Sequence, residues 1–257
     1  MENTNIVVVG LGEVGKPLFD LLSTKYDVIG VDILPPERVE RAAVLHLCFP
    51  FQITDFIGEA ARYIDMFKPA LTVVESTVAI GTTRAIAERT GAAVVNSPVR
   101  GKHRRMLEDL SLYTKFVGAI EPAAGVRAAR HFESVGLQTK LLSSPEATEL
   151  AKLSETTYFG LMIAWAQEVE RYCDLSRQSY DEVVSFYDEI KFFPPAKYVP
   201  GIIGGHCVIP NIELLSNYTH SILLDAILRS NDLKTEREVL ARGALTEALP
   251  TLSARAD

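Results

Sequence analysis

The sequence predicts an α/β protein, in which a doubly wound parallel sheet is followed by an all-helical domain with a long linking helix. Over residues 1–143, short apolar runs alternate with amphipathic helical segments, the pattern of parallel strands buried on both faces. After Pro145, apolar residues recur at three- and four-residue steps without a further proline as far as Cys173. This spacing predicts one long helix with Ser144 as its N-cap. We therefore expect a first domain over 1–143 and a second, helical domain over 144–257.

The expected strands of the first domain are apolar runs rich in β-branched residues, over 6–9, 28–31, 45–49, 71–74, 92–95, 116–120 and 139–142. The helices between them carry apolar residues at helical spacing, over 16–23, 54–67, 82–89 and 122–134. After the long helix we expect shorter helices, a Gly/Pro-rich loop over 193–210 and a helix over about 212–229. The polar stretch 234–257 is expected to fray.

Composition and charge argue against several classes of protein. A net charge of −7 argues against a nucleic-acid partner, since nucleic-acid-binding domains carry a basic excess. No apolar run is long enough to span a bilayer, and the run Ile6–Val9 is typical of a strand rather than a signal peptide. Cys48, Cys173 and Cys207 lie far apart and are odd in number, which disfavours disulfides and favours a cytoplasmic location. We expect no metal site, because the histidines and cysteines lack the paired spacing of zinc ligands.

A dinucleotide-binding fingerprint occupies the first turn of the chain. The segment Gly10-Leu11-Gly12-Glu13-Val14-Gly15 fits G-x-G-x-x-G, follows a predicted strand and opens a predicted helix. Gly10 permits the tight turn, Gly12 lets the backbone approach a pyrophosphate, and Gly15 lets helix and strand pack closely. Asp32, at the end of the second strand, can accept the ribose hydroxyls and would repel a 2′-phosphate. The pattern therefore predicts a Rossmann-type domain that binds NAD rather than NADP.

Two groups in the second half are candidates for chemistry. Lys152 and Thr156 lie four residues apart on one face of the long helix, where the lysine could stabilise an oxyanion. The alternative is a solvated lysine on an amphipathic helix. Cys207 follows adjacent glycines and His206 and precedes a helix near Asn211, so its thiol is a candidate nucleophile. The alternatives are a buried structural thiol and a structural histidine.

A basic cluster follows the fifth strand, at the edge of the sheet where ligands of open α/β folds bind. It runs from Arg100 through Lys102 to Arg105 in an otherwise acidic protein. These cations are candidates for binding a substrate phosphate or carboxylate. A solvated surface loop is an equally good interpretation.

Taken together, the motifs resemble the UDP-glucose/GDP-mannose dehydrogenase family, most closely its UDP-N-acetylmannosamine dehydrogenase branch. Five segments carry the resemblance in the family's order: the Gly10 fingerprint, Glu75-Ser76-Thr77-Val78-Ala79-Ile80-Gly81-Thr82-Thr83, Ser97-Pro98-Val99-Arg100-Gly101, Glu149-Leu150-Ala151-Lys152-Leu153-Ser154-Glu155-Thr156, and Gly204-Gly205-His206-Cys207-Val208-Ile209-Pro210-Asn211. The resemblance implies NAD-dependent oxidation of the C6 alcohol of a nucleotide sugar, twice, to a carboxylate. It further implies that Lys152 stabilises oxyanions, that Cys207 captures the aldehyde, and that Ser76 and Thr77 lie near the nicotinamide.

The sequence departs from the family at three site positions. Val99 stands where the family has Glu, Thr156 where it has Asn, and Asn211 where it has Asp. Because the Glu and Asp help to activate water, their loss bears on thioester hydrolysis and on the four-electron oxidation. The resemblance ends near residue 230, without the family's C-terminal nucleotide-sugar-binding domain. We therefore expect either a smaller substrate or a partner subunit that completes the site.

The leading interpretation is an NAD-dependent oxidoreductase that oxidises a primary alcohol of a sugar-type substrate, with nucleotide sugars included, and has Cys207, Lys152, Thr156 and Asn211 as catalytic residues. One alternative is a two-electron dehydrogenase of the β-hydroxyacid/6-phosphogluconate group, which would not need Cys207. Another is a homologue that binds NAD or another adenosine-containing cofactor without this oxidation. We also expect a homodimer formed through the helix 145–173, which is apolar on more than one face.

Overall fold

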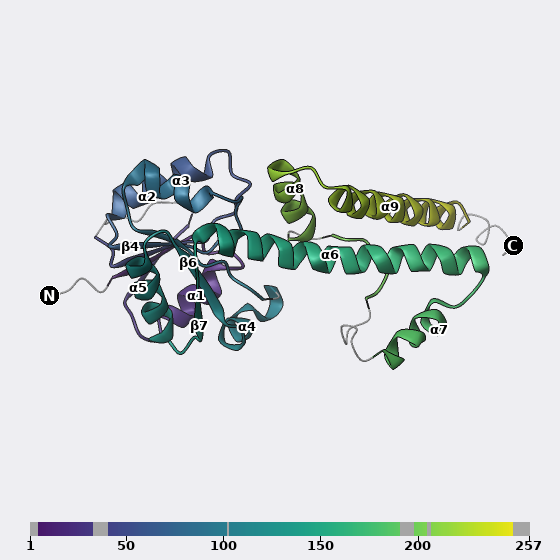
Figure 1. Ribbon diagram of the computed structural model, residues 1–257, viewed down its shortest axis with the longest axis horizontal. Coiled ribbons are helices and arrows are strands. Elements are labelled where there is room, and N and C mark those ends of the chain that lie inside the picture. The colour runs from purple at the N-terminus through teal and green to yellow at the C-terminus, as the bar shows by residue number, and fades with distance from the viewer. Residues whose placement is uncertain (1–4, 33–40, 102, 191–197, 205–206, 249–257) are drawn as a thin grey trace, which may run out of the picture. The chain divides into compact units, whose positions relative to one another are not determined.

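The computed structural model describes residues 5–32, 41–101, 103–190, 198–204 and 207–248, with backbone alone at 103 and 242–248. The chain forms two compact units, residues 1–153 and residues 154–257 (Figure 1). The first unit is the α/β part of the chain, and the second is helical in all its described elements.

The first unit is built on a seven-stranded sheet with the order β2-β1-β3-β4-β5-β6-β7. The strands are β1 (Ile6–Val9), β2 (Val28–Val31), β3 (Val44–Leu47), β4 (Leu71–Val74), β5 (Val94–Asn96), β6 (Lys115–Ala119) and β7 (Thr139–Leu142). Ile6 of β1 pairs with Val28 of β2 on one side and with Val44 of β3 on the other, both in parallel register. The predicted fold class is confirmed, and each strand lies within two residues of its predicted bounds.

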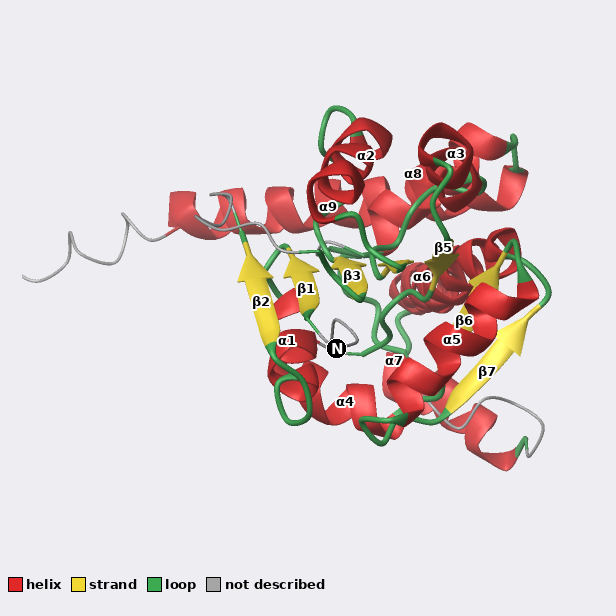
Figure 2. Cartoon of the chain, turned by 90° about the vertical axis from the view of Figure 1, so that its left-hand side faces the viewer, coloured by secondary structure: helices red, strands yellow, loops and turns green. Residues whose placement is uncertain are grey.

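Helices cover both faces of this sheet (Figure 2). They are α1 (Gly15–Leu22), α2 (Phe56–Phe67), α3 (Thr82–Thr90), α4 (Met106–Leu112) and α5 (Pro122–Glu133). α2 and α3 lie on one face, where Phe67 and Ile86 are fully buried. α1, α4 and α5 lie on the other, where Leu18 and Phe132 are fully buried. The two apolar layers explain why the strands between them are apolar on both sides.

One strand departs from the parallel arrangement. β6 pairs antiparallel with β5, with Val95 opposite Ala119, whereas β6 and β7 are again parallel to each other. The connection between β5 and β6 contains a short 3-10 helix over His103–Arg105 and α4, which sequence periodicity did not predict. α4 ends three residues before Lys115, so the chain re-enters the sheet from the edge at which β5 ends. Lys115 therefore lies at the carboxyl edge of the parallel strands.

The second unit consists of the greater part of α6 (Pro145–Ser176) together with α7 (Tyr180–Ser185), a 3-10 helix over Phe186–Glu189, α8 (Val208–Tyr218) and α9 (Ile222–Ala248). The predicted N-cap of α6 is confirmed, since the Ser144 hydroxyl accepts a hydrogen bond from the Ala147 N–H at 3.2 Å. α6 extends three residues beyond the predicted Cys173. No helix in the described ranges is both long and apolar enough to cross a membrane.

Two expectations for the second unit are wrong. The single helix expected over 212–229 is two helices, because Thr219 takes an extended conformation and ends α8 before Ser221 begins the next hydrogen-bonded turn. The polar stretch after residue 234 is helical as far as Ala248. Its charges are paired with α6, as in the Lys234–Glu170 ion pair at 2.8 Å, so polarity here reflects a charged helix interface rather than fraying.

Candidate functional site

A cleft of about 590 Å³ opens at the carboxyl ends of β1, β2 and β3. From β1 the chain proceeds outward to β2, then returns to the other side of β1 to form β3, so the strand order reverses here. Such a reversal is where open α/β sheets bind their ligands. Gly10 follows β1, Asp32 follows β2 and Phe49 follows β3, and all three line the cleft. Its other wall comes from α2 and α3, through residues that include Tyr63 and Arg89.

The three fingerprint glycines have three different surroundings. Gly10 has a φ of +85°, and a Cβ there would lie 2.8 Å from the backbone nitrogen of Phe49. A Cβ on Gly15 would lie 1.8 Å from the carbonyl oxygen of Gly10. A Cβ on Gly12 would meet nothing within 4 Å. Gly10 and Gly15 are thus required by packing, while Gly12 leaves open space beside the turn that leads into α1. This arrangement fits a pyrophosphate.

The acidic side chains on the α2 side of the cleft already have partners. Asp55 caps α2, accepting a hydrogen bond from the Gly58 N–H at 2.7 Å. Glu59 is bonded to Arg62, whose hydrogen bond holds the pKa of the Glu59 carboxyl below its usual range. Asp32, by contrast, is exposed at the end of β2. From this position a carboxylate can accept hydrogen bonds from the hydroxyls of an adenosine ribose.

The segment that carries Ser76 and Thr77 is fixed at both ends. Ser76 donates its hydroxyl proton to the carbonyl of Phe49 at 2.6 Å, which joins the ends of β4 and β3. At the other end, the buried carboxylate of Glu149 accepts hydrogen bonds from the N–H groups of Gly81 and Thr83, at 2.7 and 2.9 Å. Glu149 comes from the first turns of α6 and caps α3. The Ser76 hydroxyl is therefore a structural group as well as a predicted cofactor contact.

A buried charged network beneath this segment was not predicted. Glu75 is almost fully buried and pairs with Lys115 Nζ at 2.5 Å, and the same ammonium donates to the carbonyl of Ser97 at 2.5 Å. The other carboxylate oxygen of Glu75 lies 2.8 Å from His46 Nδ1, and His46 Nε2 lies 3.0 Å from His131 Nε2. Lys115 thus joins the ends of β4 and β5. The only sequence signal was a charged residue directly before a predicted buried strand.

The network shifts the protonation of its members. Burial alone would raise the pKa of the Glu75 carboxyl, but the charge of Lys115 and the hydrogen bond from His46 hold that pKa below its usual range. Burial, aided by His46 and Lys25, lowers the pKa of His131 from 6.5 to about 3. Glu75 is therefore ionised and His131 neutral at pH 7.

The predicted substrate-binding residues are placed unevenly. Arg100 holds its guanidinium over the rings of Tyr113 and Phe116, at 5.2 and 5.5 Å from their centroids, a cation–π arrangement. Lys102 and His206 lie outside the described residues. The predicted oxyanion residue Lys152 is half-buried on α6, one helical turn before Thr156.

In the second unit, Cys207 occupies the N-cap position of α8 and is exposed. The other two thiols differ from it: Cys173 is buried, and burial raises the pKa of the Cys48 thiol well above its usual range. One turn into α8, Asn211 donates a side-chain hydrogen bond to the hydroxyl of Thr156 on α6 at 2.6 Å. Two of the predicted catalytic residues are therefore in direct contact. Among the described residues, no group of three or more His, Cys, Asp or Glu side chains is arranged to hold a metal ion.

No protein-family model matches the chain. Over an alignment of 302 positions, gaps included, it is 25% identical to the UDP-N-acetyl-D-mannosamine dehydrogenase of Pyrococcus horikoshii, covering 95% of this chain and 71% of that protein. With the enzyme of the same name from Methanocaldococcus jannaschii it shares 23% identity over 79% of this chain and 59% of the relative. The resemblance to this dehydrogenase family is confirmed. The enzyme class expected from the sequence agrees with both relatives, although the chain spans only 71% and 59% of their lengths.

Solved structures support the same fold. The UDP-D-ManNAc dehydrogenase structure from Pyrococcus horikoshii superposes with a TM-score of 0.79 at 23% identity, covering 97% of this chain and 72% of that one. A 3-hydroxyisobutyrate dehydrogenase from Mycobacterium tuberculosis superposes with a TM-score of 0.69 at 16% identity, covering 92% of this chain and 94% of that one. At these identities the likeness concerns the fold alone.

Proposed function

We propose that this chain is an NAD-dependent oxidoreductase that oxidises a primary alcohol of a sugar-type substrate, with nucleotide sugars as the leading substrate class. The observation that carries the proposal is the cleft at the β1/β3 reversal, where the fingerprint turn meets Asp32. A pyrophosphate at the N-terminus of α1, beside the turn formed by Gly12, Glu13 and Val14 that leads into the helix, would use the open space at Gly12. When bound, NAD supplies the acceptor for the hydride that leaves the alcohol carbon.

Cys207 and Lys152 are proposed to carry out the chemistry on the carbonyl. The Cys207 sulfur would attack the aldehyde carbon, and the ammonium of Lys152 would stabilise the charge that develops on the carbonyl oxygen. A second oxidation, with a second NAD as the hydride acceptor, would convert the resulting hemithioacetal into a thioester, and water would release the carboxylate and the thiol. The exposure of Cys207 supports this role, since a nucleophile must be reached by substrate. Two sets of contacts remain predictions: those of the cofactor with Ser76 and Thr77, and those of the substrate with Arg100, Lys102 and His206.

The departures from the family bear on the last step. Asn211 and Thr156 are engaged with each other, and neither can act as a carboxylate base. Val99, the third departure, is buried and apolar. With no carboxylate at these three positions to activate water, we propose that thioester hydrolysis is the slow step.

The proposal is tested with the purified chain, NAD and UDP-N-acetyl-D-mannosamine. NADH formation is followed by absorbance, and intact-mass spectrometry follows any adduct on the protein. We expect NADH formation and a substrate adduct that maps to Cys207 and is lost in Cys207→Ser. Absence of NAD binding to the wild-type chain in a calorimetric titration would contradict the proposal.

A second candidate function is the two-electron oxidation of a β-hydroxyacid. It is favoured by one observation: Val99, Thr156 and Asn211 supply no carboxylate for the hydrolysis of a thioester, a step that this oxidation does not include. That reaction ends at the first oxidation and needs no thiol. Full turnover of 3-hydroxyisobutyrate by the Cys207→Ser variant would favour this function over the first.

We further propose that two copies of the chain pair through α6. Tyr158, Trp165 and Tyr172 are spaced seven residues apart, so they lie along one side of the helix, and each is about half exposed. Three aromatic side chains in one stripe form the kind of surface that a symmetric partner can bury.

A further inference from the structure

The segment that leads to Cys207 is held by two amide side chains, one from α6 and one from α9. The N–H of Ile203 donates to Asn231 Oδ1 at 2.7 Å, and Asn231 Nδ2 donates back to the Ile203 carbonyl at 3.1 Å. Two residues earlier, Gln167 Nε2 donates to the carbonyl of Gly201 at 2.7 Å. These three bonds hold the backbone as a neighbouring β-strand would, although no strand is present in this described segment.

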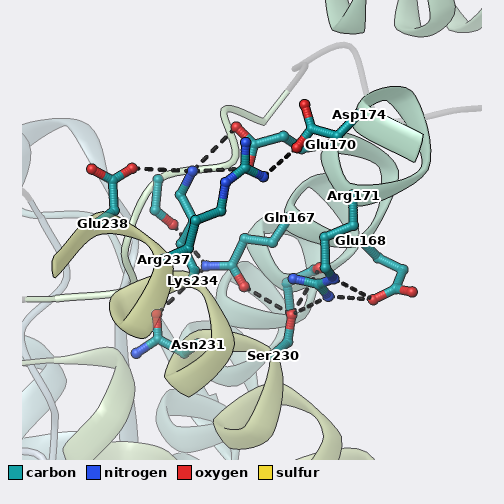
Figure 3. A network of polar contacts seen from close by, with 12 residues as sticks. Gln167, Glu168, Glu170, Arg171, Asp174, Ser230, Asn231, Lys234, Arg237 and Glu238 are labelled. Atoms are coloured by element: carbon teal, nitrogen blue, oxygen red, sulfur yellow. Dashed lines mark hydrogen bonds and ion pairs between the residues drawn. The ribbon is translucent and has the colours of Figure 1, made fainter. Parts of the chain in front are cut away.

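Both amides are themselves oriented by further contacts (Figure 3). Gln167 Oε1 accepts a hydrogen bond from the Ser230 hydroxyl at 2.9 Å, and that hydroxyl accepts one from Arg171 at 3.0 Å. The Gln167 side chain is completely buried. Because the Ser230 hydroxyl donates to its oxygen, the Gln167 amide directs its N–H groups the other way, to the Gly201 carbonyl and, at 3.5 Å, to Asn231 Oδ1.

The side chain of Ile203 adds an apolar anchor. It is buried in a cluster that also contains Val208 and Ile212 from the first turns of α8. Ile203 precedes Cys207 by four residues and Val208 follows it directly. Cys207 therefore lies between the segment 201–203 and the start of α8, which pack into the same apolar cluster. Gln167 and Asn231 hold the first of these two segments.

We propose that Gln167 and Asn231 are positioning residues for the Cys207 thiol. They hold the backbone that approaches Cys207 and so restrict the directions from which the sulfur can be reached. This inference rests on the proposed role of Cys207 as the nucleophile. It adds that the position of the sulfur depends on two amides in the α6–α9 pair.

The same helix pair offers a matched control. Further along, Lys234 bonds to Glu170 at 2.8 Å and to Glu238 at 3.2 Å, and Arg237 pairs with Asp174 (Figure 3). The pairs with Glu170 and Asp174 join α9 to α6, the pair with Glu238 lies within α9, and all three go to side chains rather than to the 201–203 backbone. Lys234→Met therefore weakens the helix pair without removing the bonds to Gly201 and Ile203.

The test measures the rate at which iodoacetamide alkylates Cys207 in the full chain, with peptide mass spectrometry to separate this thiol from Cys48 and Cys173. We expect Gln167→Met and Asn231→Leu each to raise the rate at least threefold, because a released segment lets the reagent approach the sulfur in line from more directions. Lys234→Met is expected to remain below a threefold change. If Asn231→Leu does not fold, Asn231→Asp replaces it at the same threshold, since it keeps the acceptor and loses the donor.

A rise of less than threefold in the amide variants, or an equal rise in Lys234→Met, overturns the proposal. Alkylation needs neither NAD nor substrate, so the result stands even if the wild-type chain oxidises nothing. A wild-type chain that oxidises no substrate would overturn the proposed function alone. If the wild type does turn over, the amide variants should lower kcat at least tenfold and leave the Kd for NADH unchanged, a split that a general loss of stability would not produce.

Discussion

The side-chain amide of Asn211 donates a 2.6 Å hydrogen bond to the hydroxyl of Thr156, and so connects the first turn of α8 to α6 next to Cys207. These are two of the three positions at which the chain departs from the family it resembles, and the two substituted residues are partners. The contact keeps both side chains satisfied while supplying no carboxylate.

Asn211→Asp should therefore restore a base near Cys207. The new carboxylate can accept a hydrogen bond from the Thr156 hydroxyl, so the fold is expected to tolerate it. We expect release of the carboxylate product to rise about tenfold, since a positioned general base contributes typically 10²–10⁴-fold. Quantifying acid product per NADH by chromatography checks this. Asn211→Ala, which removes the contact without adding a base, should show no gain, and equal gains in both variants would rule out a base effect.

Gly12→Ala separates cofactor binding from folding. Because a Cβ at this position meets nothing within 4 Å, the thermal unfolding midpoint should be close to that of the wild type. The affinity for NADH should fall about tenfold or more, since the methyl group enters the space assigned to the pyrophosphate. Gly15→Ala, with its Cβ 1.8 Å from the Gly10 oxygen, should instead lower the unfolding midpoint. Calorimetry and NADH fluorescence titration measure the two effects, and unchanged NADH affinity in Gly12→Ala would contradict the assignment.

Asp32→Asn tests the preference for NAD. Removing the carboxylate should weaken NADH binding and strengthen NADPH binding relative to it, because the repulsion of a 2′-phosphate is lost. The ratio of the two dissociation constants is the quantity to compare. As a control on charge alone, Asp55→Asn alters a cleft carboxylate that is already engaged as a helix cap, and should change the ratio little.

Lys115→Met should be among the most destabilising substitutions in the first unit. It leaves Glu75 buried with His46 as its remaining side-chain partner, and breaking a buried pair by removing one member costs about 3–5 kcal/mol. Adding Glu75→Gln should recover part of that loss, because the uncompensated charge is removed. Urea unfolding of the two variants measures the difference, and a double variant less stable than the single one would show that the charge is not the cause.

His131 should make the stability of the chain fall in acid. Its pKa is 6.5 in the ordinary state and about 3 in the fold, so below pH 6.5 the unfolded chain binds a proton that the folded chain does not. The stabilisation is thus fully present above pH 6.5 and decreases as the pH falls toward about 3. His131→Gln should flatten this slope in urea titrations across that range. A slope in His131→Gln equal to that of the wild type would contradict this assignment.

Much of the fold could be predicted because it is local. Each strand and most helices appear in the sequence as a run or a periodic pattern of apolar residues. The fingerprint turn is recognised by its glycines, which its tight geometry requires. The direction of β6 is not local, because an apolar run pairs equally well in either direction. The break between α8 and α9 was missed because apolar residues continue on both sides of Thr219. The helicity beyond residue 234 depends on charges of α6 that lie some sixty residues away in the sequence.

The site was predictable to the extent that its residues lie in motifs. The glycines, Asp32 and Cys207 could be named because their neighbours in the chain define their setting. Glu75 and Lys115 are 40 residues apart and meet only through the antiparallel strand. Gln167 and Asn231 are likewise residues without a motif, whose role depends on the backbone they contact.

The reversed strand β6 has a mechanical consequence for the ligand edge of the sheet. In an all-parallel sheet, the loops that follow the strand ends form that edge. Such loops are more mobile than the strands they follow. Because β6 begins there, its first residue is already within the hydrogen-bonded ladder. The backbone of Lys115 is consequently fixed by strand register, and from there its ammonium bonds to Glu75 and to the Ser97 carbonyl, at the ends of β4 and β5.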